Sequence, residues 1–302
     1  MSNINRWDAQ NIPDLTGKTI IITGANSGLG LETTRALARK NAEIIMACRN
    51  QEKAASAKKQ IRSEIPQARL IIMPLDLADL TSIRRFAIQF QNEYQKLDVL
   101  INNAGLMMLK TLTHTKDGFE MQFGINHLGH FALVGLLLET LLKTPTSRVI
   151  AVSSNAHNFG KLNFNNLNSE KRYSRSFAYF NSKLANLLFT YEFQRKLEAA
   201  DASTIAAAAH PGWSNTNLQA YSGIMDFVFP IFGQTAEMGA LPILYAASMP
   251  DVKGGKYFGP DGFQGWRGYP TRVSSNARSK KIEDASKLWA VSEDLTGIQY
   301  TF

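Results

Sequence analysis

The chain has 302 residues, of which 44% are hydrophobic and 19% charged, a balance typical of a folded globular protein rather than a disordered one. A formal net charge of +8 makes nucleic acid or an anionic membrane a candidate partner, but lysine and arginine are scattered along the chain. The single cysteine, Cys48, excludes an internal disulfide, and no apolar run is long enough to span a bilayer. Residues 1–17 also lack the apolar core of a signal peptide. We therefore expect a soluble cytoplasmic protein with no transmembrane segment and no nucleic-acid partner.

Short apolar runs alternate along the chain with longer helical patterns. The runs predict strands at residues 19–22, 44–47, 70–73, 99–101, 149–152 and 204–209. The patterns predict helices at 31–40, 51–65, 80–94, 117–142 and 176–197, with an Asn-rich loop at 155–175. This alternation is typical of an α/β protein whose parallel sheet is covered on both faces. Because ligands of such sheets bind beyond the carboxyl ends of the strands, one crevice should be faced by Gly24, Cys48, Asp76, Asn102, Ser154 and Pro211.

The stretch Thr23 to Gly30 joins the first predicted strand to the first helix and contains glycines at positions 24, 28 and 30. Glycine supplies the unusual dihedrals of a tight turn and lets a ligand approach the bare backbone. The helix that follows offers free N–H groups and a positive dipole end to a phosphate. The stretch therefore favours dinucleotide binding, although the spacing G-x-x-x-G-x-G is also consistent with a tight turn alone.

Tyr179 and Lys183 are four residues apart in a helical pattern and so share one face. An ammonium group beside a phenol favours the phenolate, which makes tyrosine a feasible acid or base near neutral pH. Ser154 ends the fifth predicted strand, and its hydroxyl could hold a substrate oxygen near Tyr179. A surface Tyr–Lys pair and a serine that caps the loop are the alternative interpretations.

Further motifs follow the glycine stretch in order, namely Asn102-Asn103-Ala104-Gly105, Asn126, Ser154, Tyr179-Phe-Asn-Ser-Lys183 and Pro211-Gly212 with Thr216. This ordered set resembles the short-chain dehydrogenase/reductase superfamily over essentially the whole chain. Residues 118–131, 179–190 and 288–293 resemble its retinol dehydrogenase-like branch and the bacterial relatives of that branch. The resemblance implies one domain spanning residues 1–302, an α/β Rossmann fold. Its sheet should be doubly wound and mostly parallel, with about seven strands, helices on both faces and a variable substrate loop around residues 218–233.

The resemblance also implies the roles of particular residues. Tyr179 would exchange a proton with the substrate oxygen, Ser154 would orient that oxygen, and Lys183 would bind the nicotinamide ribose and lower the tyrosine pKa. Asn126 would hold a water that relays protons to Lys183. The cofactor would be bound by Gly24, Asn26, Ser27, Gly28, Leu29, Gly30, Arg49, Asp76, Leu77, Asn103, Ala104, Gly105, Tyr179, Lys183, Pro211, Gly212 and Thr216.

The choice of cofactor can be argued from the end of the second predicted strand. An NAD site usually has a carboxylate there, which accepts a hydrogen bond from the ribose 2′-hydroxyl. Here Cys48 is followed by Arg49, whose guanidinium can bind a 2′-phosphate bidentately. We therefore expect NADP(H) rather than NAD(H), unless Arg49 simply opens the next helix. Asp76 would contact the adenine or, alternatively, cap the following helix.

Residues 218–233 are rich in aromatic and aliphatic side chains but are too short and too interrupted to span a membrane. We expect an apolar lid over the cofactor, with an interfacial membrane contact or an oligomer interface as the alternatives. A lid of this kind predicts a lipophilic alcohol, aldehyde or ketone as substrate.

Other functions stay open from the sequence. The chain could be a catalytically idle NADP(H)-binding sensor or partner-binding module of the same fold, and it could form a homo-oligomer. The five histidines match no zinc-binding spacing, so we expect no metal and structural roles for His114, His127, His130, His157 and His210. Nucleic-acid binding has only the net charge in its favour.

Overall fold

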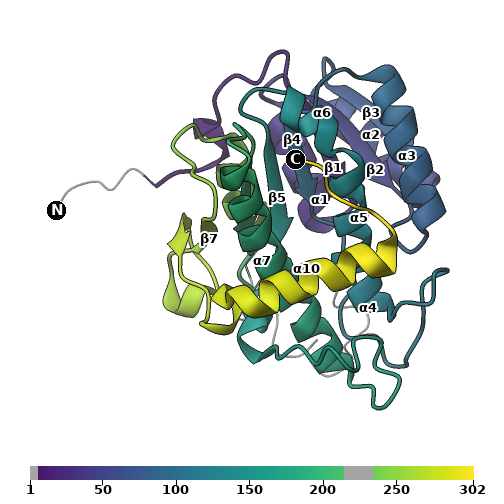
Figure 1. Cartoon of the computed structure of the whole chain (residues 1–302). Helices are drawn as coiled ribbons and strands as arrows, with labels where there is room; N and C mark the ends of the chain where they lie inside the picture. The colour runs from purple at the N-terminus through teal and green to yellow at the C-terminus, as the bar shows by residue number, and fades with distance from the viewer. Residues whose placement is uncertain (1–5, 214–233) are drawn as a thin grey trace.

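A computed structural model describes residues 6–213 and 234–302, which form one α/β domain of the Rossmann type around an eight-stranded sheet (Figure 1). The spatial order is β3-β2-β1-β4-β5-β6-β7-β8, and all neighbouring pairs are parallel except β7 and β8. The strands are β1 Thr19–Thr23, β2 Glu43–Cys48, β3 Arg69–Pro74, β4 Val99–Asn102, β5 Arg148–Val152, β6 Ile205–Ala209, β7 Tyr257–Pro260 and β8 Pro270–Val273. The predicted fold class is confirmed, with one strand more than the expected seven.

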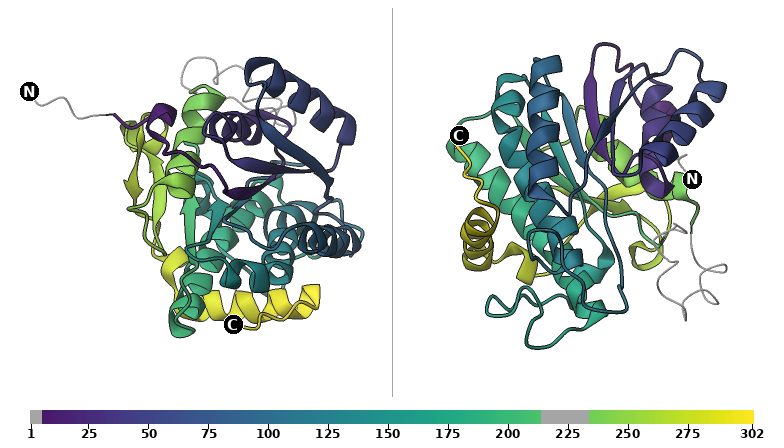
Figure 2. Two further views of the ribbon diagram at one scale, coloured as in Figure 1. Left: turned by 90° about the horizontal axis from the view of Figure 1, so that it is seen from above. Right: turned by 90° about the vertical axis from the view of Figure 1, so that its right-hand side faces the viewer.

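Helices cover both faces of the sheet (Figure 2) because successive strand side chains point to opposite sides. Ile20 and Ile22 of β1 belong to one buried cluster, and Ile21 belongs to the cluster on the other side. The first face is covered by α1 Gly28–Ala38, α2 Gln51–Glu64 and α9 Ala236–Ser248. The second is covered by α3 Leu80–Glu93, α5 Gly129–Leu136, α6 Leu138–Lys143 and α7 Arg175–Ala199.

The predicted helix over residues 117–142 is wrong as one continuous element. Helix α4 Met121–Phe123 begins only after Glu120, whose carboxylate accepts hydrogen bonds from the first backbone N–H groups. A π-helical turn at Gly124–Leu128 follows, in which the Gly129 N–H bonds the Gly124 carbonyl, and α5 and α6 are separate beyond it. Such π turns are frequent at functional sites, and this one contains Asn126.

The C-terminal third adds elements that the sequence patterns did not predict. The last helix, α10 Ile282–Thr296, lies across α7 (Figure 1). Its Trp289 stacks on Phe189 with ring centroids 5.7 Å apart and meets Phe131 edge-on at 5.2 Å. This aromatic cluster packs the C-terminal helix against the helices that contain the predicted site residues. Within the described part of the chain, no helix combines the length and the hydrophobicity needed to cross a membrane.

Candidate active site

A cavity of about 1500 Å³ opens at the carboxyl ends of the parallel strands. Its wall contains every predicted catalytic and cofactor-binding residue of the described chain except Asn126. The predicted crevice residues Cys48 and Asn102 do not line it, because both side chains point into the interior and are only 1% and 3% exposed. The Cys48 thiol instead accepts hydrogen bonds from the Ala25 and Asn26 backbone, and burial raises its pKa to about 11. Thr216 and the predicted lid, residues 218–233, lie outside the described residues.

The glycine turn has the features that a phosphate site requires. Gly24 and Gly28 adopt φ values of +67° and +50°, which favour glycine. Ser27 precedes α1 but makes no side-chain capping hydrogen bond, so its hydroxyl leaves the first N–H groups of that helix uncapped. Uncapped N–H groups at a helix start, facing a cavity, fit the pyrophosphate of a dinucleotide.

Gly30 serves a different purpose from the other two glycines. A Cβ atom there would lie 2.2 Å from the Gly24 carbonyl oxygen and 2.6 Å from Asn103 Nδ2. Although alanine usually stabilises a helix relative to glycine, we expect Gly30→Ala to lower the melting temperature and to weaken dinucleotide binding, because the backbone must move to admit the methyl group. Thermal unfolding and a fluorescence titration with a dinucleotide measure the two effects. A variant as stable and as tightly binding as the wild type would contradict this interpretation.

A buried hydrogen-bond network joins the glycine turn to Asn126. The Thr23 hydroxyl accepts from the N–H groups of Asn103 and Ala104, both at 2.9 Å, and contacts His130 Nε2 at 2.9 Å. His130 Nδ1 lies 3.1 Å from the Asn126 carbonyl oxygen, which can only accept, so Nδ1 carries the proton and Nε2 accepts from Thr23. Burial lowers the pKa of His130 to about 4, which keeps the imidazole neutral at pH 7.

The Asn126 side chain is fully buried behind the cavity wall rather than in it. Its Oδ1 accepts from the Leu106 N–H at 2.7 Å, and its Nδ2 donates to the Leu106 carbonyl at 2.9 Å and to Ser182 Oγ at 2.9 Å. The amide therefore connects the loop after β4 to α7 by hydrogen bonds. Gly105 lies between Asn126 and Lys183, since a Cβ there would be 3.0 Å from Asn126 Oδ1 and 3.6 Å from Lys183 Nζ.

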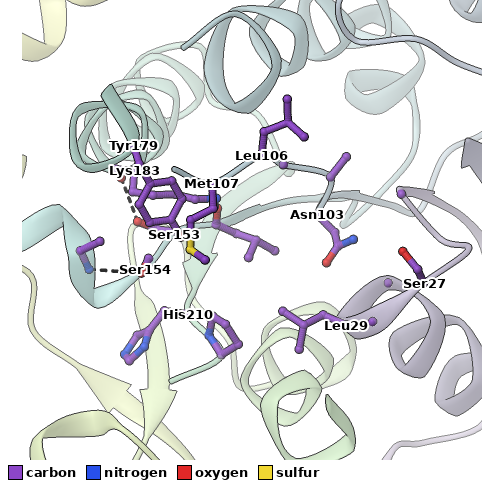
Figure 3. A pocket seen from close by; sticks show the side chains of 18 of the residues that line it. Ser27, Leu29, Asn103, Leu106, Met107, Ser153, Ser154, Tyr179, Lys183 and His210 are labelled. Carbon is purple, nitrogen blue, oxygen red and sulfur yellow. Dashed lines mark hydrogen bonds between the residues drawn. The ribbon is translucent and has the colours of Figure 1, made fainter. Parts of the chain in front are cut away.

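Tyr179, Lys183 and Ser154 lie together at one end of the cavity (Figure 3). Helix α7 presents the first two, and the end of β5 presents the serine. Lys183 Nζ is 5.7 Å from the centroid of the Tyr179 ring and donates to the Val152 carbonyl at 3.1 Å. The Ser154 hydroxyl accepts from the Ala156 N–H at 3.2 Å and directs its own proton toward the Tyr179 oxygen.

The electrostatics of these groups follow from their burial. Burial lowers the pKa of Lys183 to about 8. It raises the pKa of Tyr179, and a hydrogen bond from Ser154 only partly opposes the rise. The net shift of the Tyr179 pKa is thus upward, opposite to the lowering expected from Lys183, because the ammonium group points at the Val152 carbonyl and not at the phenol oxygen. At pH 7 the tyrosine is a protonated acid.

Arg49 and Asp76 lie at the other end of the cavity. Arg49 is exposed and belongs to no ion pair in the described part of the chain, so its guanidinium is available to an anion. Asp76 Oδ1 accepts from the Ala78 N–H at 3.0 Å, whereas Asp79 caps α3. Lys53 also lines this end of the cavity and was not predicted from the sequence. It lies in the first turn of α2, just after Arg49 in the sequence, and that proximity is the signal that could have identified it.

The wall near Tyr179 is mostly apolar and aromatic. It includes side chains from four separate segments between the main elements and from α7, namely Leu106, Met107, Phe159, Phe180, Trp213 and Trp266. The two indole rings are 5.0 Å apart, and Phe159 meets Phe180 at 5.4 Å. None of these residues was predicted; all except Phe180 lie in segments that carry no periodic pattern, and Phe180 lies in the predicted helix 176–197.

The five histidines differ in their surroundings. His114 is exposed, His127 contacts Ser292 Oγ in the core at 2.9 Å, and His210 lines the cavity. His130 and His157 are buried directly behind the site. Across residues 6–213 and 234–302, no group of three His, Cys, Asp or Glu side chains is arranged to hold a metal ion.

A doubly wound sheet with an open glycine turn after its first strand defines a dinucleotide-binding protein. The sequence model described as short chain dehydrogenase matches residues 18–224. The chain therefore belongs to the short-chain dehydrogenase family, oxidoreductases that bind a nicotinamide cofactor and interconvert alcohols and carbonyl compounds.

Individual relatives place the chain in the retinol dehydrogenase-like part of the family. It is 43% identical over 291 residues to retinol dehydrogenase 12 of Homo sapiens, covering 95% of this chain and 88% of that protein. It is 41% identical to human retinol dehydrogenase 14, covering 93% and 87%. A solved structure of an uncharacterized protein from Mycobacterium paratuberculosis is 44% identical and superposes with a TM-score of 0.84, covering 98% and 100%. The predicted superfamily and branch are confirmed.

Proposed function

We propose that the protein is an NADP(H)-dependent oxidoreductase that interconverts a lipophilic alcohol and its aldehyde or ketone, with Tyr179 as the acid and base. The observation that carries the proposal is the shared cavity. The Tyr179, Ser154 and Lys183 side chains line the same wall as the open glycine turn, so a bound dinucleotide would extend from the turn to the tyrosine. A cofactor bound in this way supplies or accepts the hydride, and the protein supplies position and a proton.

Each side chain would then act through contacts that the structure provides. Ser154 donates its hydroxyl proton to the substrate oxygen, which would replace the Tyr179 oxygen as the acceptor. Tyr179 gives its proton to that oxygen during reduction and recovers one from the alcohol during oxidation. Lys183 holds the nicotinamide ribose and supplies positive charge beside the phenol.

Asn126 would hold a water that relays protons to Lys183. The gap that Gly105 leaves between the Asn126 amide and the Lys183 ammonium supports this proposal, because a larger residue would fill it. Both Nδ2 protons of the amide are used by Leu106 and Ser182, whereas Oδ1 accepts one hydrogen bond only. A bridging water would therefore donate to the second lone pair of Oδ1.

The preference for NADP(H) rests on the end of β2. No carboxylate follows this strand, and the cavity wall there contains Arg49 and Lys53. Two cations favour a 2′-phosphate, and a guanidinium can bind it bidentately. An NAD site would place a carboxylate at this position to accept from the 2′-hydroxyl.

The lipophilic substrate rests on the wall near Tyr179. Aromatic and methionine side chains surround the reaction end of the cavity, and apolar surfaces of this kind select apolar ligands. The names of the relatives point to retinol, a long polyene alcohol that would suit such a wall. We therefore propose elongated or ring-containing lipophilic carbonyls and alcohols as the substrate class.

A cofactor-oxidation screen tests the proposal. Purified protein is mixed with NADPH and with aliphatic, aromatic and polycyclic carbonyl compounds, including retinal, and absorbance is followed, with NADH as the control cofactor. We expect NADPH oxidation to be fastest with long-chain or ring aldehydes. A clear preference for small polar carbonyls would contradict the substrate class, and NADPH binding without turnover of any compound would favour the idle sensor or partner-binding module.

The pKa of Lys183 gives a test in the same assay. Because burial lowers it to about 8, the ammonium is charged at pH 7 and loses its charge above that pKa. Burial raises the pKa of Tyr179, so the phenol stays protonated over the same range. We expect kcat/KM for carbonyl reduction to fall as pH rises through about 8. The residual activity of Lys183→Arg, which stays charged, should lack this loss, and an equally steep loss in both proteins would contradict the assignment.

Two further proposals rest on the sequence alone, namely a cytoplasmic location and the absence of a nucleic-acid partner. The scattered distribution of lysine and arginine supports the second, because nucleic-acid sites usually gather basic residues on one surface. Salt-sensitive binding of DNA or RNA in a filter assay would contradict it.

A further inference from the structure

His157 lies three residues after Ser154, in the 3-10 helix Asn155–Phe159, and its side chain is buried. Its Nδ1 is 2.6 Å from the Ser154 carbonyl oxygen. A carbonyl can only accept a hydrogen bond, so Nδ1 carries the proton. Burial lowers the pKa of His157, which keeps the ring neutral at pH 7 and makes Nε2 an acceptor. The Nε2 atom accepts from the Asn276 backbone N–H at 3.4 Å.

The far side of the His157 ring is held by the segment before α10. Asn276 Nδ2 donates to the His157 carbonyl at 3.2 Å, and the Ser279 N–H fixes Asn276 by donating to its Oδ1 at 2.9 Å. Arg278 Nη1 donates to the Gly160 carbonyl at 3.1 Å, just beyond the same helix. The segment 276–279 therefore contacts both the ring and the end of the short helix, which favours the ring orientation toward Ser154.

The Ser154 carbonyl consequently receives two donors from one residue. The His157 N–H donates at 3.0 Å as part of the helical turn, and His157 Nδ1 adds the shorter side-chain bond. These bonds fix the peptide plane that follows Ser154. The Ser154 hydroxyl is attached to the same residue and lies beside Tyr179 (Figure 3), so a fixed plane holds in place the backbone that carries this hydroxyl.

We propose that His157 is a positioning residue for the reaction, whose Nδ1–H holds the Ser154 backbone so that the serine hydroxyl stays within reach of the substrate oxygen, while Asn276 fixes the ring. The inference rests on the proposed function, in which Ser154 orients that oxygen. His157 itself does not line the cavity and so acts only through Ser154. If His157 had a purely structural role, loss of the Nε2 contact to Asn276 would have a larger effect than loss of the Nδ1–H bond to Ser154.

Two substitutions separate these roles because they replace different ring nitrogens. His157→Asn places an amide N–H near the position of Nδ1 and gives up the Nε2 contact. His157→Gln reaches the position of Nε2 and gives up Nδ1. As a matched control, Tyr191→Phe removes the 2.8 Å contact between the Tyr191 hydroxyl and Ser275 Oγ, which loosens the same C-terminal segment without touching His157.

The measurements are kcat and KM for carbonyl reduction, the dissociation constant of NADPH and the melting temperature. We expect kcat to fall by about 10- to 100-fold in His157→Gln and by much less in His157→Asn, since small displacements of a positioning group have effects of this size. NADPH binding should be unchanged in both variants. Tyr191→Phe should lower the melting temperature and leave kcat near that of the wild type.

Each outcome bears on the inference. The positioning role would be overturned if kcat were equal in the Asn and Gln variants or higher in the Gln variant. It would also be overturned if kcat followed the melting temperature across all three variants. In each case the proposed function would stay intact. A wild type that reduces no lipophilic carbonyl would contradict the proposed function itself and overturn the positioning role with it. A Gln variant that is slow but folded and still binds NADPH supports the inference.

Discussion

Tyr179→Phe should abolish most carbonyl reduction, with kcat falling by about 10²- to 10⁴-fold, the usual contribution of a positioned general acid. The substitution removes only the hydroxyl. The ring, which packs 6.4 Å from Phe180, keeps its place, and so does the Lys183 ammonium at the Val152 carbonyl. The loss should therefore appear in kcat, whereas the dissociation constant of NADPH should stay close to that of the wild type.

Steady-state kinetics with the best carbonyl from the screen, together with an NADPH fluorescence titration, measure the two quantities. Tyr191→Phe makes the same chemical change on the same helix but outside the cavity, and it should keep its turnover. Activity retained by Tyr179→Phe would remove Tyr179 from the mechanism. A parallel loss of NADPH binding would show instead that the hydroxyl holds the cofactor.

The strands before residue 210 could be predicted because each is a short apolar run between polar turns. Residues 20–22 are buried on both faces of the sheet, so their continuous isoleucines carry a signal that needs no tertiary context. The break in the predicted helix 117–142 could not be found in this way. It depends on the Glu120 cap and on the π turn at Gly124–Leu128, and nothing in the apolar pattern of this stretch marks either. Strands β7 and β8 are short and contain proline, which weakens any strand pattern.

The site was predictable where residue type and strand position together determine it, as for the glycine turn and for Ser154. Cys48 and Asn102 fail because the end of a strand does not say which way a side chain points, and both point inward. His157 could only be assigned a structural role, since the partner that fixes its ring, Asn276, is 119 residues away. The apolar wall could not be predicted for the same reason. Met107, Phe159 and Trp266 are far apart in the sequence, and only the fold brings them to one cavity.

Arg49→Ala should raise the KM for NADPH by about 10- to 100-fold and leave the KM for NADH almost unchanged. A charge-assisted hydrogen bond contributes about 1.5–3 kcal/mol, which corresponds to this factor. NADH has no 2′-phosphate, so it loses nothing when the guanidinium is removed. Because Arg49 is exposed and unpaired in the described part of the chain, the substitution should leave the melting temperature nearly unchanged.

The control for net charge is Lys59→Ala, which removes one exposed cation from α2 but does not line the cavity. It should leave both KM values near those of the wild type. Lys53→Ala should produce a smaller increase in the KM for NADPH than Arg49→Ala does, because an ammonium binds a phosphate as a point charge rather than bidentately. An unchanged KM for NADPH in Arg49→Ala would reject the assignment of Arg49 to the 2′-phosphate. The alternative that Arg49 opens the next helix is already wrong, because α2 begins at Gln51 and Asn50 caps it. Equal increases for NADPH and NADH would show that Arg49 holds a part of the dinucleotide common to both, and the preference for NADP(H) would then have to come from Lys53.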